Sequence, residues 1–147
     1  FRNAMKWDED DVRLVPLEWL KPHERIKERN RNKLLDMTKR WNGYTKPLIV
    51  DKRTGAILDG HHRFSIAALL ELKRLPVICV DYLADENITV ETWPGSERDT
   101  LSKDEVIEMS LSGNLFPPKT SRHTIADHLP PIFISLDELK LENDSQP

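Results

Sequence analysis

The stretch around Gly60 places the strongest constraint on how this chain folds. An apolar run over residues 56–58 precedes it and a helix-like run over 64–72 follows it, so a strand is expected to pass directly into a helix. Between the two runs lie one carboxylate, one glycine, two imidazoles and one guanidinium, in the order Asp59-Gly60-His61-His62-Arg63. Glycine lets the backbone approach a ligand closely, and free N–H groups at the start of a helix attract anions. The stretch therefore predicts an anion-binding turn.

Length and composition indicate one domain of ordinary globular type. The chain has 147 residues, of which 38% are hydrophobic and 32% are charged. Its net charge of −3 gives no broad basic face, so we expect no nucleic-acid partner. No apolar run reaches transmembrane length and no signal-peptide pattern is present, so we expect no membrane contact and a cytoplasmic location. The single cysteine, Cys79, fits a reducing compartment. A trimmed leader ahead of Phe1 and the oligomeric state stay open.

Apolar patterns along the chain predict short strands interleaved with helices. Strands are expected at 12–15, 47–50, 56–58, 75–83 and 87–93, and 75–83 is expected to be the central one. Helices are expected at 26–41, 63–72, 102–113 and 136–139. Only some of the connections have room for a crossover helix. The pattern therefore predicts an α+β fold, a single compact domain with a small mixed sheet and flanking helices.

The two ends of the chain are expected to lie outside this domain. Residues 1–11 are polar and acidic, so they are expected to form a flexible N-terminal segment. The folded domain is expected to span residues 12–140. Residues 141–147 are expected to be a tail.

Three polar clusters each follow an apolar element, so each can be held at one rim of the sheet. The first is the turn at Gly60, and the second is Lys21-Pro22-His23-Glu24. The third, Lys119-Thr120-Ser121-Arg122-His123, has two hydroxyls and three basic side chains behind two prolines. This composition is typical of a loop that recognises an acid, with a flexible basic loop as the alternative.

Individual residues of the first cluster allow a second interpretation. Asp59 has two interpretations, a cap for the helix that follows it or a functional group of the turn. Adjacent side chains on a helix point in different directions, so His61 and His62 are not expected to bind one zinc ion. Arg63 is either a surface ion pair or a ligand for an anion, and the second is favoured because a helix start disfavours a cation.

Two of these stretches together resemble a known family. The run of residues 57–63, combined with residues 115–123, resembles the free L-serine kinases of the ParB/sulfiredoxin superfamily. Residues 15–24 are also similar to the start of that domain, and the resemblance spans roughly residues 12–125. The first motif marks the superfamily, and the second points to the kinases.

The resemblance implies a fold and an activity. The fold is the ParB/sulfiredoxin-like domain, and the activity is transfer of a phosphoryl group from ATP or ADP to the hydroxyl of free L-serine, which gives O-phosphoserine. The implied partners are free L-serine and an adenine nucleotide, and the implied cofactor is Mg²⁺. Members of this family are longer than this chain, so the adenine pocket and the choice of donor stay open.

The resemblance also implies roles for single residues. The residues Gly60, His61, His62 and Arg63 hold the donor phosphates, and Asp59 lies near the transferred group as a ligand of Mg²⁺. Glu24 is the base for the serine hydroxyl, with Glu18 and Glu28 as alternatives. The catalytic residues are then Glu24, Asp59 and His61. The acceptor is bound by Trp93, Lys119, Thr120, Ser121, Arg122 and His123.

Three rival functions share parts of this pattern. A sulfiredoxin-like phosphoryl transferase has an attacking cysteine where this chain has His61. A ParB-like nucleotide-binding module without kinase activity carries a downstream helix-turn-helix region and an arginine-rich signature. The third rival is a binding protein that keeps the pocket without turnover.

Overall fold

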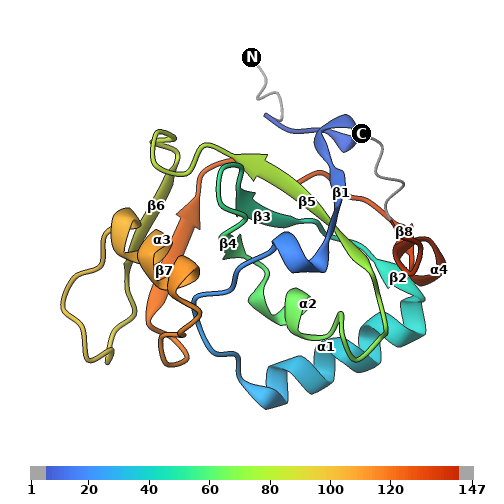
Figure 1. Cartoon of the computed structure of the whole chain (residues 1–147), viewed down its shortest axis with the longest axis horizontal. Coiled ribbons are helices and arrows are strands. Elements are labelled where there is room, and N and C mark those ends of the chain that lie inside the picture. The colour runs from blue at the N-terminus through green and yellow to red at the C-terminus, as the bar shows by residue number, and fades with distance from the viewer. Residues whose placement is uncertain (1–5, 143–147) are drawn as a thin grey trace.

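A four-stranded mixed sheet forms the centre of the computed structural model, which describes residues 6–142 (Figure 1). Its strands, in spatial order, are β1 (Arg13–Pro16), β5 (Arg74–Val80), β3 (Leu48–Asp51) and β4 (Ile57–Asp59). The strand β5 runs antiparallel to β1 and parallel to β3. This confirms the expected central strand and the mixed sheet.

Helices and two small two-stranded sheets surround the central sheet. The helices are α1 (Glu28–Trp41), α2 (His61–Ser65), α3 (Lys103–Ser112) and α4 (Leu136–Leu139). One small sheet pairs β2 (Gly43–Tyr44) with β8 (Ile134–Ser135), and the other pairs β6 (Ile88–Thr92) with β7 (Ser121–Ile125). Short 3-10 turns occur at Glu9–Asp11 and Leu17–Trp19. The α+β prediction is confirmed.

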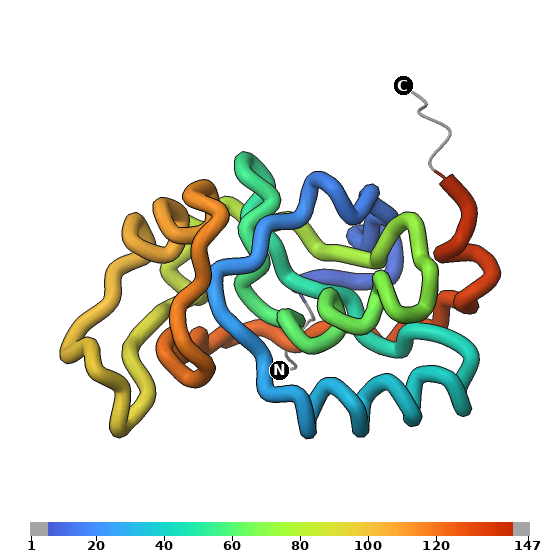
Figure 2. Tube along the Cα trace, turned by 60° about the horizontal axis from the view of Figure 1, so that its bottom comes forward, coloured from blue at the N-terminus to red at the C-terminus, as the bar shows by residue number. Residues whose placement is uncertain are grey.

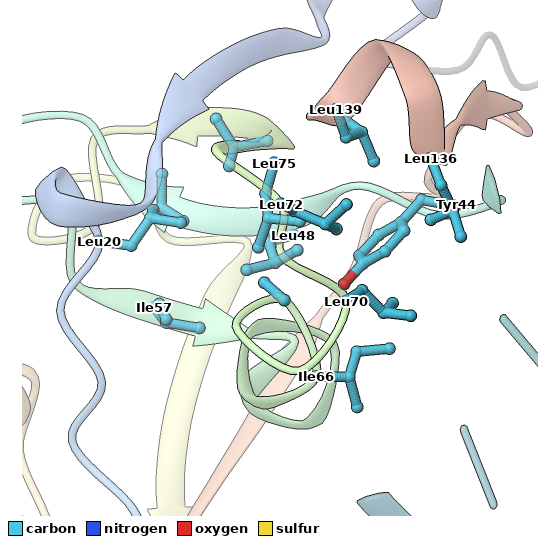
Figure 3. Packing of buried hydrophobic residues seen from close by; sticks show 13 residues of the cluster. Leu20, Tyr44, Leu48, Ile57, Ile66, Leu70, Leu72, Leu75, Leu136 and Leu139 are labelled. Atoms are coloured by element: carbon cyan, nitrogen blue, oxygen red, sulfur yellow. The ribbon is translucent and has the colours of Figure 1, made fainter. Parts of the chain in front are cut away.

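Two hydrophobic clusters cover the two faces of the central sheet. Side chains alternate along a strand, so Leu48 and Val50 of β3 enter the first cluster while Ile49 enters the second. The first cluster includes the residues drawn in Figure 3 and packs under α2 and α4. The second cluster packs β6 and α3 against the other face. All four residues of β3 are buried, so this strand lies at the middle of the protein.

The helix expected over 63–72 is much shorter in the structure. The helix α2 ends at Ser65, and turns follow as far as Leu72. Leu70 and Leu72 are both buried. A continued helix would point Leu70 and Leu72 to opposite sides, because they are two residues apart. The turn instead lets both side chains enter the first cluster. Glu71 adopts the left-handed conformation that this turn requires.

The third polar cluster was expected to be a loop, and three of its five residues lie in a strand. Ser121 begins β7, which pairs with β6 along five residues. Along β7, half-buried and exposed residues alternate. Its half-buried positions include Ser121 and His123, so the apolar alternation by which a strand is recognised is missing.

The N-terminal segment is packed where the structure describes it. Trp7 is only 6% exposed and joins the second cluster, and Lys6 Nζ lies 2.8 Å from Asp85 Oδ2. Trp7 therefore anchors this part of the segment, and the flexibility expected over residues 1–11 stays a prediction. Residues 1–5 and 143–147 lie outside the described part, so the domain limits stay a prediction. Within residues 6–142, no helix is long and apolar enough to cross a membrane.

We expect Leu75→Ala to lower the free energy of unfolding by about 2–5 kcal/mol, because it leaves a cavity in the first cluster. Leu69→Ala is the matched control, since Leu69 is exposed, and its effect is expected to stay within about 0.5 kcal/mol. Urea denaturation measures both values. Equal losses for the two variants would contradict the position of the core.

Candidate active site

The three polar clusters meet at one cavity of about 260 Å³. The segment before β7 runs beside the segment before α1 (Figure 2). Two backbone hydrogen bonds join these segments, from Phe116 N to the His23 oxygen and from Arg25 N to the Phe116 oxygen. The sequence-predicted residues that line the cavity are Glu24, Asp59, Gly60, His61, His62, Trp93, Lys119, Ser121, Arg122 and His123.

The turn between β4 and α2 depends on Gly60. Its φ is +114°, and a Cβ atom there would lie 2.6 Å from Leu48 Cγ. No side chain caps α2. The first N–H groups of a helix have no partner inside the helix, so the turn presents free donors. The cap interpretation of Asp59 is therefore wrong.

Asp59 forms an ion pair with Arg63. Their Oδ2 and Nη2 atoms lie 3.2 Å apart, and Arg63 Nη2 also donates to the Pro47 oxygen. The side chain of Arg63 does not line the cavity at which the three polar clusters meet. It lies instead at a small apolar cavity beside α1. Arg63 thus reaches the site through Asp59.

Glu24 is the residue that joins the second and third clusters. Its Oε2 accepts a hydrogen bond from the backbone N–H of Lys119 at 3.0 Å. Its Oε1 accepts from the N–H of Thr120 at 3.3 Å and from the N–H of Ser121 at 2.7 Å. Consecutive N–H groups that point at one anion form a nest, and Lys119 has the left-handed conformation typical of one. The Thr120 side chain does not line the cavity and donates to the Pro117 oxygen.

Neighbouring histidines form the floor of the cavity, where His61 and His123 line it and the buried His23 packs behind them. His23 is fully buried, and its ring lies edge-on to His61, with centroids 4.5 Å apart, and 5.7 Å from the ring of His123. His123 Nε2 lies 2.8 Å from the hydroxyl oxygen of Tyr82. The backbone N–H of His23 donates to His61 Nε2, and that of Lys27 donates to His62 Nε2. The loop at 23–27 thus orients both imidazoles of the turn.

These histidines are neutral at neutral pH. Burial lowers the pKa of His23 to about 4 and that of His123 to about 3. Burial, followed by the nearby histidines, holds the pKa of His61 well below its usual value. Burial and then Arg63 also lower the pKa of His62. The rings therefore act as hydrogen-bonding groups in the cavity.

Two cationic side chains lie against the ring of Trp93 at the mouth of the cavity. Lys119 Nζ and the guanidinium of Arg122 each lie 4.9 Å from the centre of its ring. Trp93 Nε1 also donates to the Ser121 oxygen at 3.1 Å. Neither cation forms an ion pair with any residue of the described range. The mouth therefore has uncompensated positive charge that suits a carboxylate or a phosphate.

The sequence-based prediction gave His23 no role, although it lies in the second polar cluster, and it did not include Tyr82. His23 had one usable signal, because it directly precedes Glu24 in a polar loop. Tyr82 fell at the end of the predicted strand over 75–83 and looked like a core residue. Its contact with His123 spans 41 residues of sequence, so no local pattern indicates it.

No family model matches this chain, but curated proteins do. It is 29% identical over 102 residues to the ADP-dependent L-serine kinase of Thermococcus kodakarensis, covering 67% of this chain and 41% of that protein. It is 32% identical over 84 residues to the ATP-dependent L-serine kinase of Staphylothermus marinus, covering 54% and 33%. It is 37% identical over 82 residues to a ParB-like protein of Sulfolobus acidocaldarius, covering 52% and 40%. The matched parts span less than half the length of each relative.

Solved structures show the same fold. A free serine kinase in complex with AMP aligns with a TM-score of 0.79 at 19% identity, covering 88% of this chain and 93% of that one. The fold is that of the free serine kinases. A C-terminally truncated SbnI from Staphylococcus aureus aligns with a TM-score of 0.77 at 14% identity, covering 95% and 93%. The resemblance drawn from the two motifs is confirmed.

The histidine floor predicts that stability falls as the pH drops from about 6.5 toward 4. Histidines of the unfolded chain take up protons in this range, whereas His23 and His123 stay neutral while folded. Each of these two histidines is expected to lower the free energy of unfolding by about 1.4 kcal/mol per pH unit over this range. Urea denaturation at pH 7, 6 and 5 measures the slope.

Two variants test whether the buried histidines cause this loss of stability at low pH. His23→Gln is expected to reduce the slope, and His128→Gln, at an exposed position, is expected to keep it. An unchanged free energy of unfolding between pH 6.5 and 4.5 would contradict the neutral floor.

Proposed function

We propose that this protein transfers a phosphoryl group from ATP or ADP to the hydroxyl of free L-serine and releases O-phosphoserine. One observation carries the proposal: Glu24, the turn at Gly60 and the segment from Lys119 to His123 line a single cavity. Phosphoryl transfer needs two substrates held in line and their charge neutralised. The named L-serine kinases among the relatives support the same reaction.

The donor half of the site is the turn at Gly60. Uncapped N–H groups and two neutral imidazoles there are suited to the oxygens of a nucleotide phosphate. At about 260 Å³, the cavity is of a size for a small metabolite and a phosphoryl group, so the rest of the nucleotide extends beyond it. Arg63 supports this half by holding Asp59.

Asp59 fits a magnesium ion that arrives with the nucleotide. Within residues 6–142, no group of three or more His, Cys, Asp or Glu side chains could hold a metal ion. Mg²⁺ commonly binds one or two carboxylates together with substrate phosphates and water. The Asp59 side chain is 47% exposed at the cavity, so it suits that pattern. The bound ion would neutralise charge on the phosphates.

The acceptor half is the segment from Lys119 to His123. Lys119 and Arg122 attract the carboxylate of serine, and Trp93 forms the wall beside them. The ring of His123 completes this side of the pocket, and the backbone N–H of Thr120 holds Glu24. The serine hydroxyl oxygen attacks the terminal phosphorus, the bond from phosphorus to the leaving nucleotide breaks, and the hydroxyl proton passes to Glu24. Of Glu24 and its two alternatives, Glu18 and Glu28, only Glu24 lines the cavity.

A direct assay tests this function. The protein is incubated with Mg²⁺, L-serine and either ATP or ADP in separate tubes, and O-phosphoserine is measured by mass spectrometry. Product with one donor supports the proposal and identifies the donor. The absence of product with both donors would overturn it and favour a nucleotide-binding module without kinase activity.

We expect Glu24→Gln to lower turnover by at least about 100-fold, because an amide cannot accept the hydroxyl proton. Nucleotide affinity is expected to change little, since Glu24 lies on the acceptor side. Glu28→Gln, at an exposed position in α1, is the matched control. Initial rates and nucleotide titrations measure the two effects, and full activity of Glu24→Gln would refute its role as the base.

We expect Arg63→Ala to weaken nucleotide binding by about tenfold, the effect of losing one charge-assisted hydrogen bond. The physical reason is that Asp59 loses the partner that holds it at the turn. Arg53→Ala removes an exposed ion pair with Asp81 and serves as the control. Isothermal titration measures both affinities. An unchanged affinity for Arg63→Ala would contradict its link to the donor phosphates.

A further inference from the structure

The hydroxyl of Ser121 has the surroundings that an acceptor hydroxyl needs. Its Oγ lies 2.6 Å from Glu24 Oε1, the atom pair expected between a substrate hydroxyl and its base. Ser121 is also the only residue with an aliphatic hydroxyl among the described residues that line the cavity. The protein therefore holds one of its own serines where a free serine is expected to react.

The hydrogen bonds around Ser121 have a definite direction. An ionised carboxylate only accepts, so Ser121 donates its O–H to Glu24. His23 Nε2 lies 3.0 Å from the same Oγ, and since the hydroxyl proton is already used, His23 must donate here. A hydroxyl oxygen has two lone pairs, and His23 uses one of them. The second lone pair is left for an electrophile in the cavity.

The donor turn is close to this hydroxyl. His23 contacts Ser121 through its ring and His61 through its backbone N–H, at 3.0 Å and 3.1 Å. Ser121, Gly60 and His61 also line the same cavity. A phosphate held at the turn would therefore face Ser121 across one small space.

Other hydroxyls near the site lack this arrangement. Thr120 donates to the Pro117 oxygen, and Ser65 donates to the His62 oxygen. Neither one lines the cavity. Backbone carbonyls do not act as bases, so neither hydroxyl is activated.

We propose that the protein phosphorylates its own Ser121 when no free serine is bound, an inference that rests on the proposed kinase function. Ser121 Oγ attacks the terminal phosphorus of the bound nucleotide. The bond between that phosphorus and the bridging oxygen breaks, so the nucleotide leaves one phosphoryl group shorter. The hydroxyl proton passes to Glu24. No further reactant is required.

The modification blocks the acceptor site. A phosphoryl group adds a charge of about −1.5 to −2 and would fill part of the cavity next to Lys119 and Arg122. These cations stabilise the modified state, whereas Glu24 is repelled by it. Modification and serine turnover therefore exclude each other, and each chain takes up one phosphoryl group at most at this site.

The test uses the protein with Mg²⁺ and ATP or ADP, with and without saturating L-serine. Without serine, intact-mass measurement is expected to show the addition of one phosphoryl group, and peptide fragmentation is expected to place it on residue 121. Saturating serine is expected to slow this modification at least tenfold. Protein incubated first with nucleotide alone is expected to lose serine-kinase activity in proportion to the modified fraction.

Three variants make the assignment specific. Ser121→Ala is expected to stay unmodified, and Ser121→Thr keeps a hydroxyl and is expected to carry the phosphoryl group on its threonine. Ser112→Ala, at an exposed site in α3, is the matched control and is expected to be modified like the unaltered protein.

The outcomes separate this inference from the kinase function. O-phosphoserine in the tube with serine, together with an unmodified Ser121 in the tube without it, would overturn the inference and leave the function intact. A phosphoryl group on another residue, or a modification that serine does not slow, would also overturn it. The absence of both products would overturn both proposals.

Discussion

The carboxylate of Glu24 is the contact on which the site depends. It accepts hydrogen bonds from three consecutive backbone N–H groups, at Lys119, Thr120 and Ser121, which lie more than ninety residues further along the chain. Without that anion the three converging N–H groups would have no acceptor. The left-handed conformation of Lys119 would then lose the contact that stabilises it. The same carboxylate faces the cavity. One side chain therefore joins the second and third polar clusters, and it is also the residue that we propose as the base.

Burial of the histidine floor complements this contact. His23, His61 and His123 bring polar atoms into the interior without bringing charge, because burial keeps their pKa values low. The charged side chains that line the cavity are Glu24, Arg25, Asp59, Lys119 and Arg122. In the proposed phosphoryl transfer, developing negative charge would meet the cations and hydrogen-bond donors that line this cavity.

Local patterns in the sequence indicated most of this fold and much of the site. The strand over β5, the helix α3 behind its capping box and the turn at Gly60 each follow from short-range chemistry, and the structure has all three. The errors have one cause, which is tertiary contact. The residues after Ser65 leave the helix because Leu70 and Leu72 fill one cluster. His23 and Tyr82 were missed because their partners lie far away in sequence.

The acceptor half stands on a two-stranded ribbon, β6 and β7, and not on the central sheet. The end of the ribbon at Ser121 and His123 lines the cavity, while Ile88, Val90 and Ile125, on the same face toward its other end, pack onto the second cluster. The donor turn, in contrast, grows directly out of β4 in the central sheet. One face of the ribbon thus contributes both to the cavity and to the second cluster, at opposite ends. Substitutions at the cavity end of the ribbon would therefore disturb the core less than substitutions at Ile88, which is fully buried.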